Sequence, residues 1–269
     1  MGIPKIIHYC WFGGNSLPEK DLKCIESWRR FCPDYKIVEW NESNYDINKN
    51  EYMKEAYDAQ RWGFVPDYAR LDIIYQYGGI YLDTDVELIR KLDDLLDQRA
   101  FMAFESEKTV APGLIIASEP HNETIRNMMI DIYENRHFLR SDGTYDLVAS
   151  PRMATDYLID KGLLCNNKLQ VVKDMKIYPT DFFCPKDYLT GEINITDNTY
   201  SIHHYNASWQ TPRQKKWHKL EMKMMKIIGN KKMERLRDTI VWKGIQVLYV
   251  KGIVYCVKRL HLVYKDNRK

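Results

Sequence analysis

The sequence lacks any apolar stretch long enough to cross a membrane, and it lacks a secretion signal. A spanning helix needs about 18 to 20 consecutive apolar residues, and no window of the chain approaches that length. No charged, apolar and small-residue leader stands at the N-terminus, where Met1–Lys5 runs directly into a strand-like segment. We therefore expect a chain that is not secreted and works in the cytoplasm.

Cysteine is sparse and shows no metal-site or disulfide pattern. The sequence holds 6 cysteines, with no CxxC pair and no cluster at ligand spacing. Reduced cytosolic thiols are the expected state. Internal repeats and low-complexity tracts are absent too, which excludes repeat and disordered architectures.

What the sequence does hold is enough apolar residues for a sizeable core, together with an uneven distribution of charge. A chain of 269 residues with 45% hydrophobic residues fits one large domain or a domain with an appendage. The net charge is only +3, but residues 213–269 hold 17 of the 40 Lys and Arg and 4 of the 37 Asp and Glu, a difference of +13. We expect a domain at residues 1–212 and a basic tail at residues 213–269 with an anionic partner, either nucleic acid or a lipid surface.

The first part of the chain predicts an α/β fold. Lys5–Phe12 is apolar and β-prone, and the turn Gly13-Gly14-Asn15 ends it. A helical segment at Leu17–Phe31 and a second strand at Tyr35–Trp40 follow. This β-α-β opening is typical of a layered, mainly parallel sheet.

A pair of aspartates follows a further predicted strand. Helical spacing in Asp67–Tyr77 predicts a helix that ends at Gly78–Gly79, and Ile80–Leu82 is the next strand. The triplet Asp-Thr-Asp at residues 83–85 then stands where ligands bind in open α/β sheets. Two carboxylates at this spacing can hold Mg²⁺ or Mn²⁺ and leave positions free for phosphate oxygens. Taken alone, such a triplet is more often a solvated turn.

Asp67 and Arg70 precede this triplet on one helix face. As an i,i+3 pair they could form a local surface ion pair, which contributes only a few tenths of a kcal/mol. Alternatively, Arg70 could grip a diphosphate in the bidentate manner that suits a guanidinium, while Asp67 accepts a hydroxyl hydrogen bond.

The tail is helical in period from Trp217 onward. Within Ile240–Tyr264, four lysines fall on one narrow face and apolar residues cover much of the remainder; they are Lys243, Lys251, Lys258 and Lys265. This pattern suits an interfacial helix on an anionic membrane surface. The alternative is an amphipathic helix packed on the domain.

Four separated motifs resemble the glycosyltransferases whose sugar-binding region contains a DXD motif. They lie at residues 7–14, 65–70, 78–85 and 202–209, in the order of that family. The family includes the family-32 capsular-polysaccharide and yeast mannosyltransferase-like enzymes and is related to the large clostridial glucosylating toxins. The resemblance implies a GT-A type, Rossmann-like nucleotide-sugar-binding domain with a mixed, mainly parallel sheet, to which the basic helical tail is appended.

The resemblance also implies roles in binding the donor. Trp11 would stack on the nucleotide base, and Asp67 would hold hydroxyl groups of the ribose or the donor sugar. Arg70 would contact the donor, and Tyr81 and Asp83 would orient the ribose, the sugar and metal-bound water. Pro66 stands where the family has a small residue.

A metal site and a closing segment are implied as well. Asp85 would bind Mn²⁺ or Mg²⁺ directly, with His204 as the late ligand and Asp83 beside them. His203 and His204 are adjacent on an extended segment, so their rings point to opposite faces and at most one is expected to be a ligand. Ser208 and Trp209 would close over the diphosphate.

The resemblance implies a retaining, metal-dependent transfer of a hexose or N-acetylhexosamine from a nucleotide sugar, with a UDP-sugar as the commonest donor in the family. The catalytic set is Asp67, Arg70, Asp83 and Asp85. The expected acceptor is a glycan, lipid-linked in capsular, O-antigen or exopolysaccharide synthesis, at the inner face of the plasma membrane and without a nucleic-acid partner. Two alternatives are a haloacid-dehalogenase-like phosphatase, which Leu82–Val86 also resembles, and a non-enzymatic membrane or nucleic-acid adaptor built on the tail.

Overall fold

The structure is a computed structural model that describes residues 2–188, 190–206 and 212–252. It divides into two compact units. The first comprises Met1–Asp187 and Ile193–Asn206, and the second comprises Tyr188–Glu192 and Ala207–Lys269. The five cysteines in the described part of the chain form no disulfide.

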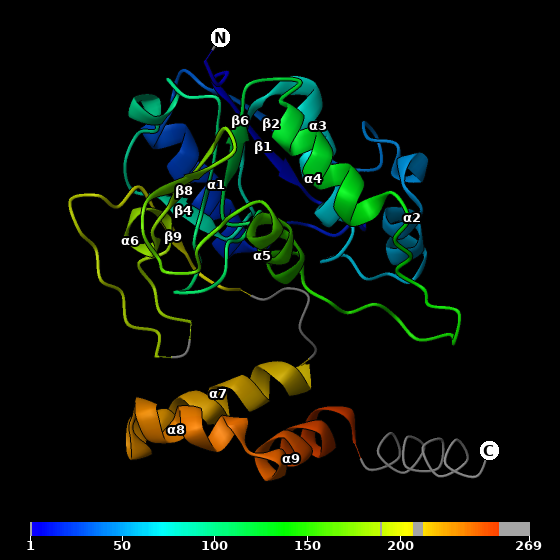
Figure 1. Ribbon diagram of the computed structural model, residues 1–269, viewed down its shortest axis with the longest axis vertical. Helices are drawn as coiled ribbons and strands as arrows, with labels where there is room; N and C mark the ends of the chain where they lie inside the picture. The colour runs from blue at the N-terminus through cyan, green and yellow to red at the C-terminus, as the bar shows by residue number, and fades with distance from the viewer. Residues whose placement is uncertain (1, 189, 207–211, 253–269) are drawn as a thin grey trace. The chain divides into compact units, whose positions relative to one another are not determined.

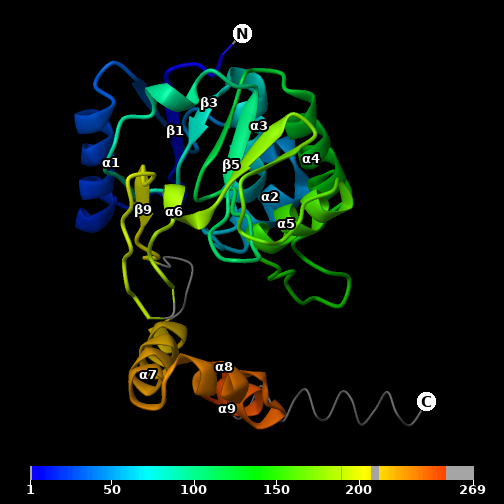
Figure 2. The same ribbon diagram turned by 60° about the vertical axis from the view of Figure 1, so that its left-hand side comes forward.

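The first unit is built on a seven-stranded sheet with the order β2-β1-β3-β6-β5-β8-β7 (Figures 1 and 2). Five strands, β2, β1, β3, β5 and β8, run in one direction, and β6 and β7 run in the opposite one. The prediction of an α/β fold with a mixed, mainly parallel sheet is therefore confirmed. The strands are β1 (Ile6–Cys10), β2 (Lys36–Trp40), β3 (Gly79–Tyr81), β5 (Ala100–Ala103), β6 (Ile116–Ser118), β7 (Gln170–Val172) and β8 (Met175–Tyr178).

The β-α-β opening forms as predicted. β1 and β2 pair in parallel from Ile6 opposite Lys36 to Cys10 opposite Trp40, and α1 (Glu19–Phe31) connects them. The fully buried Trp28 of α1 donates its indole Nε1–H to the carbonyl oxygen of Val86 at 2.7 Å. This bond fastens α1 to the segment that follows the aspartate triplet.

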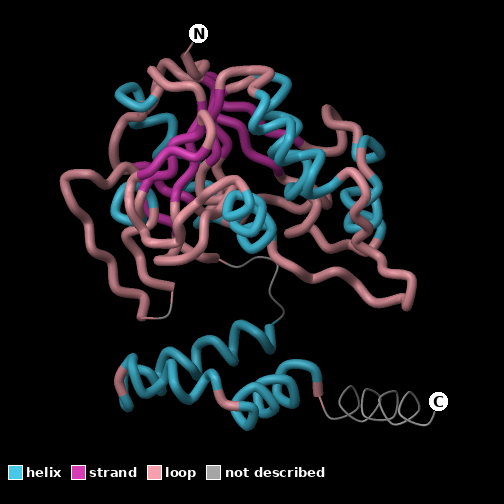
Figure 3. The backbone as a smooth tube through the Cα atoms, viewed as in Figure 1, coloured by secondary structure: helices cyan, strands magenta, loops and turns pink. Residues whose placement is uncertain are grey.

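Helices cover both faces of the sheet, so the unit has two apolar cores (Figure 3). Side chains alternate along each strand: Tyr81 lies in the core with α2 to α5, whereas Ile80 lies in the core with α1 and α6. Continuous apolar runs such as Ala100–Ala103 follow from this, because both strand faces are buried. The helices are α2 (Glu51–Asp58), α3 (Pro66–Tyr77), α4 (Glu123–Tyr133), α5 (Ser150–Asp160) and α6 (Thr180–Phe183), with 3-10 turns η1 (Ile47–Lys49) and η2 (Asp93–Leu95).

Helix α3 begins and ends where its sequence dictates. Pro66 occupies the first turn, where proline's fixed φ and missing N–H fit a helix start. Gly78 has a φ of 64° and Gly79 a φ of 93°, a region that favours glycine. A Cβ at Gly79 would also lie 2.7 Å from the carbonyl oxygen of Ile6, so the pair lets β3 start directly beside β1.

A second, two-stranded sheet brings a late segment to the aspartate triplet. β4 (Val86–Leu88) pairs antiparallel with β9 (Ser201–His203), with Val86 opposite His203. An extended segment was expected at His203 and His204, but its partner strand was not predictable from local patterns.

The second unit is helical, as the period of the tail predicted. It contains α7 (Pro212–Ile228), α8 (Asn230–Asp238) and α9 (Ile240–Lys251). The expectation of one helix through Tyr264 is wrong at Gly252, where α9 ends with a φ of 82°. Lys258 and Lys265 lie outside the described residues. None of the described helices is long and apolar enough to span a membrane.

Candidate active site

Three strands that run in the same direction end at the edge of the sheet where the candidate site lies. Trp11 follows β1, Asp83 follows β3, and Glu105 lies just beyond β5. In open α/β sheets this carboxyl edge is the usual place for a ligand. Burial raises the pKa of Glu105; the positive charge of His203 opposes that rise and the negative charge of Asp83 adds to it. Glu105 was not predicted from the sequence.

Asp83 is held on three sides and remains partly open. Its backbone N–H donates to the carbonyl oxygen of Gly113 at 2.8 Å, and the Tyr81 hydroxyl donates to its Oδ1 at 3.0 Å. The Nη2 of Arg70 lies 3.5 Å from the same Oδ1. The side chain is still 34% exposed, so it can meet a ligand.

Asp67 and Arg70 form a buried pair, which rules out the surface ion pair considered above. Their side chains are 3% and 5% exposed, and Arg70 Nη2 lies 3.3 Å from Asp67 Oδ1. Arg70 Nη1 donates to Ser150 Oγ at 3.4 Å, and the guanidinium lies 5.2 Å from the centre of the Tyr81 ring. Its buried Nε has no partner among the described residues. An arginine carries five N–H donors, so these few, long contacts leave capacity for oxygen atoms of a ligand.

The charges of this pair depend on each other. Burial raises the pKa of Asp67 to about 6, although the charge of Arg70 opposes that rise. Burial alone would lower the pKa of Arg70, but the charges of Asp83, Tyr81 and Asp67 outweigh it and raise that pKa. At neutral pH the site therefore contains a buried, fully charged guanidinium.

Asp85 is paired with His203 rather than with His204, which corrects the expected arrangement. His203 Nε2 lies 3.2 Å from Asp85 Oδ1, whereas His204 Nε2 lies 2.7 Å from Glu87 Oε2. The two histidine rings point to opposite faces, as expected. The backbone N–H of Val86 donates to the carbonyl oxygen of Asp83 at 3.1 Å and closes a turn that contains Asp85, whose carboxylate lies on the His203 side.

The charges of Asp85 and His203 also reinforce each other. Burial raises the pKa of Asp85, but the charge and hydrogen bond of His203 and the Asn206 backbone N–H together hold it below its ordinary value. Burial lowers the pKa of His203, and Asp85 outweighs this and raises it well above its ordinary value. Asp85 is thus a carboxylate and His203 an imidazolium at neutral pH.

A hydrogen-bond chain fixes Asp85 from a second side. The backbone N–H of Asn206 donates to Asp85 Oδ2 at 2.7 Å, and the Asn206 side-chain amide donates to Asp21 Oδ1 at 2.6 Å. Asp21 lies in the first turn of α1 and is buried. No sequence pattern singled out Asp21, because an acid in a first helical turn is ordinarily explained by the helix dipole.

Trp11 is half-buried: it packs against the core on the α1 side of the sheet and leaves part of its ring open. Its indole Nε1–H donates to the carbonyl oxygen of Asn15 at 2.6 Å. Beside it, a Cβ on Gly13 would lie 2.8 Å from the Trp62 ring. Ser208 and Trp209 lie outside the described residues.

The two aspartates suit a divalent ion that is shared with a phosphate-bearing ligand. No three His, Cys, Asp or Glu side chains within residues 2–188, 190–206 and 212–252 gather in a way that could hold an ion. Mg²⁺ is commonly bound by one or two carboxylates together with water and substrate phosphates, rather than by an all-protein cage. Asp83 and Asp85 are the two carboxylates that could act as such ligands, although His203 and the Asn206 backbone N–H already contact the two oxygens of Asp85.

Gly113 is a site residue that sequence patterns did not single out. A Cβ at this position would lie 2.1 Å from Asp83 Oδ2 and 2.9 Å from Arg70 Nη1. The loop between β5 and β6 therefore needs a residue without a side chain, because the Asp83 carboxylate occupies the space.

We expect Gly113→Ala to lower kcat/KM for donor turnover by about 100-fold, since an ångström-scale displacement of a positioned group can cost that much. The thermal midpoint should change little, because Asp83 is partly exposed and can move. Gly244→Ala is a matched control, since its position is open to an added Cβ and, like Gly113, it does not have a positive φ. A Gly113→Ala enzyme with unchanged kcat/KM would show that the Asp83 position is not critical.

Activity should fall as the pH drops through about 6, because protonation of Asp67 removes the negative charge that pairs with Arg70. Above that pH the carboxylate is ionised and the pair is complete. The measurement is kcat/KM for donor hydrolysis against pH in wild type and Asp67→Asn. The variant should lose the inflection near pH 6; an inflection of the same position and size in the variant would assign it elsewhere.

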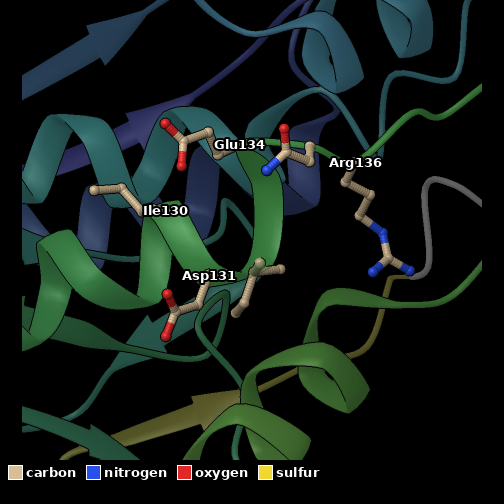
Figure 4. A pocket seen from close by; sticks show the side chains of 6 residues that line it. Ile130, Asp131, Glu134 and Arg136 are labelled. Carbon is tan, nitrogen blue, oxygen red and sulfur yellow. The ribbon is translucent and has the colours of Figure 1, made fainter.

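An open hollow of about 520 Å³ lies away from these residues, at the C-terminal end of α4 (Figure 4). Its lining contains Asp131, Glu134 and Arg136 but none of the expected site residues. Arg136 Nη2 is already paired with Asp146 Oδ2 at 2.6 Å. The hollow therefore contains none of the residues that form the candidate active site.

Comparisons with known proteins identify the class of this chain. The family described as "Glycosyltransferase sugar-binding region containing DXD motif" matches residues 18–102. The chain belongs to this family of glycosyltransferases. Because the chain belongs to a family of glycosyltransferases, the two alternative functions, a phosphatase and a non-enzymatic adaptor, are set aside.

Relatives cover different shares of the chain. An uncharacterized glycosyltransferase, L373, of Acanthamoeba polyphaga mimivirus is 30% identical over 215 residues, covering 74% of this chain and 83% of the relative. Inositol phosphoceramide mannosyltransferase 3 of Schizosaccharomyces pombe is 32% identical over 137 residues, covering 47% of this chain. The matched region spans only 37% of that yeast protein's length. The solved PaToxG glycosyltransferase has a TM-score of 0.47 at 18% identity, covering 60% of this chain and 70% of that one.

Proposed function

We propose that the chain transfers a hexose from a nucleoside-diphosphate sugar to an acceptor hydroxyl, with a divalent ion and with retention of anomeric configuration. The observation that carries the proposal is the buried, incompletely hydrogen-bonded Arg70 beside the partly open carboxylate of Asp83. A buried cation with spare donors suits an anionic ligand, and a diphosphate is the anion that a sugar nucleotide presents.

Each residue then has a definite task. Arg70 donates to phosphate oxygens, and Asp67 holds the guanidinium in place through Nη2. Asp83, oriented by Tyr81 and Gly113, accepts hydrogen bonds from donor hydroxyls. Because the leaving group is a diphosphate, no protein nucleophile is required.

Asp83 and Asp85 would hold Mn²⁺ or Mg²⁺. When bound, the ion neutralises the charge that builds on the departing nucleoside diphosphate, an effect typically worth several kcal/mol of barrier. Asp85 is kept ionised by His203 and is aimed by Asn206, so it is prepared for this role at neutral pH.

The acceptor is proposed to be a lipid-linked glycan or a glycolipid. Support comes from the yeast relative, whose name gives inositol phosphoceramide as the molecule that receives mannose. The acceptor named for this relative and the expected polysaccharide acceptors have one group in common, a hydroxyl on a lipid-bound sugar or polyol.

The test is a donor screen that reads release of nucleoside diphosphate from a panel of UDP- and GDP-sugars. We expect slow hydrolysis of at least one donor with Mn²⁺ and none with excess chelator. Anomeric analysis of the transferred sugar then reads retention. Full activity in chelator, or release of phosphate from simple phosphoesters without turnover of any sugar nucleotide, would contradict the proposal.

A further inference from the structure

Helix α9 carries a row of apolar side chains that its own unit leaves uncovered. Val241, Ile245, Leu248 and Tyr249 are between 44% and 72% exposed. At about 100° per residue, these positions fall within one arc of roughly 100° on the helix. They therefore form a continuous face, which we call the α9 face.

An adjoining side of α9 already belongs to a core. Trp242 is buried with Trp217, Met225 and Met233, and Val250 packs against the same cluster. The Trp217 and Trp242 rings lie 5.2 Å apart. Tyr249 also contacts this core, with its ring 5.3 Å from that of Trp217, so the uncovered part of the α9 face consists chiefly of Val241, Ile245 and Leu248.

The same unit is strongly basic. Residues 212–252 contain 12 Lys and Arg and 3 Asp and Glu. One of the three acids, Glu221, is buried and accepts a hydrogen bond from Trp242 Nε1 at 3.0 Å, with Arg237 Nε at 3.7 Å. Basic side chains such as Lys219, Lys223 and Lys243 are exposed. The surface thus combines aliphatic groups with a large excess of positive charge.

We propose that the α9 face inserts into the surface of an anionic membrane, with the surrounding lysines and arginines on the headgroups. A helix of this composition lies in the interface plane, where its apolar face reaches the acyl boundary and each basic residue gains attraction from anionic lipid. Nucleic acid would satisfy the charge but offers no apolar layer for Ile245 and Leu248. Only a lipid surface matches both halves of the pattern.

This inference goes beyond the transfer reaction and does not depend on it. Membrane attachment would hold the enzyme where lipid-borne acceptors lie, in agreement with the peripheral location expected from the tail sequence. Membrane attachment is measured by a binding experiment, so a failure to bind membranes would not contradict the proposed transfer reaction.

The experiment is sedimentation of the full chain with vesicles of phosphatidylcholine alone and of phosphatidylcholine mixed with phosphatidylglycerol. We expect binding to the mixed vesicles and little to the neutral ones. Ile245→Asn with Leu248→Asn should lower the partition coefficient by about tenfold or more, because two aliphatic side chains no longer enter the lipid. Lys219→Gln with Lys223→Gln should weaken binding and flatten its salt dependence.

The matched control is Leu147→Asn with Leu169→Asn, which removes two similarly exposed leucines from the first unit. It should bind like wild type. Tryptophan emission and circular dichroism check that each variant retains its helical unit. Equal binding to both vesicle types, or unchanged binding of the α9 variant, would overturn the proposal. A lipid-free dimer that the α9 variant dissociates would assign the face to a second copy, and nucleic-acid binding without vesicle binding would assign the charge to that polymer.

Discussion

Replacing Asp85 with asparagine is expected to lower kcat/KM for donor hydrolysis by about a thousandfold. Asparagine keeps the size of the side chain and an oxygen for the Asn206 backbone N–H, so the local structure should persist. What it removes is the negative charge that would hold the divalent ion. A thousandfold loss corresponds to roughly 4 kcal/mol, at 1.36 kcal/mol for each factor of ten, within the several kcal/mol that such ions contribute.

The control for this prediction is Asp97→Asn, which neutralises an exposed aspartate outside the site. It should leave donor hydrolysis within about twofold of wild type. Raising the Mn²⁺ concentration should recover part of the Asp85→Asn activity only if Asp83 still binds the ion. Activity of Asp85→Asn within a few-fold of wild type at all ion concentrations would remove Asp85 from the mechanism.

Replacing Arg70 with methionine is expected to abolish donor turnover and to lower the free energy of unfolding by about 3 kcal/mol. The stability loss follows from burial, because breaking a buried ion pair by removing one partner leaves the other charge uncompensated. Asp67 would be that charge, and its side chain is only 3% exposed. Chemical denaturation at neutral pH measures the effect.

Two comparisons separate this cause from simple loss of packing. Asp67→Asn combined with Arg70→Met should recover much of the stability but no activity, because no buried charge is left alone. The stability loss of Arg70→Met should also shrink as the pH falls. Burial already raises the Asp67 pKa to about 6 with Arg70 present, and loss of Arg70 raises it further. The folded chain then binds the Asp67 proton more tightly than the unfolded chain, so protonation relieves the cost. A double variant as unstable as Arg70→Met would show that packing dominates.

Local sequence patterns predicted the elements that local physics controls. The β1-α1-β2 opening, helix α3 and its end at Gly78–Gly79 depend on periodicity and glycine conformation within short windows, and the structure agrees to within a residue or two at most boundaries. The parallel character of the sheet was predicted from the order of these elements, and its mixed character from the family resemblance.

The candidate site was predictable only in part, because it depends on contacts between distant segments. Asp83 is positioned by Gly113 and Arg70 touches Ser150, and neither partner lies in a recognisable motif. The choice between His203 and His204 depends on how β9 pairs with β4, which no spacing reveals. Burial of the Asp67–Arg70 pair likewise arises from tertiary packing, since an i,i+3 pair alone indicates a surface bridge.

The proposed reaction depends on the aspartates after β3, which would hold an ion that in turn holds the nucleoside diphosphate. Calorimetric titration of UDP and GDP into the full chain, with and without Mn²⁺, tests this role without needing the donor sugar or the acceptor. We expect Mn²⁺ to tighten binding of one nucleotide by at least about tenfold in wild type and to have no effect on Asp85→Asn. Equal affinity with and without the ion, or the same enhancement in Asp85→Asn, would contradict it.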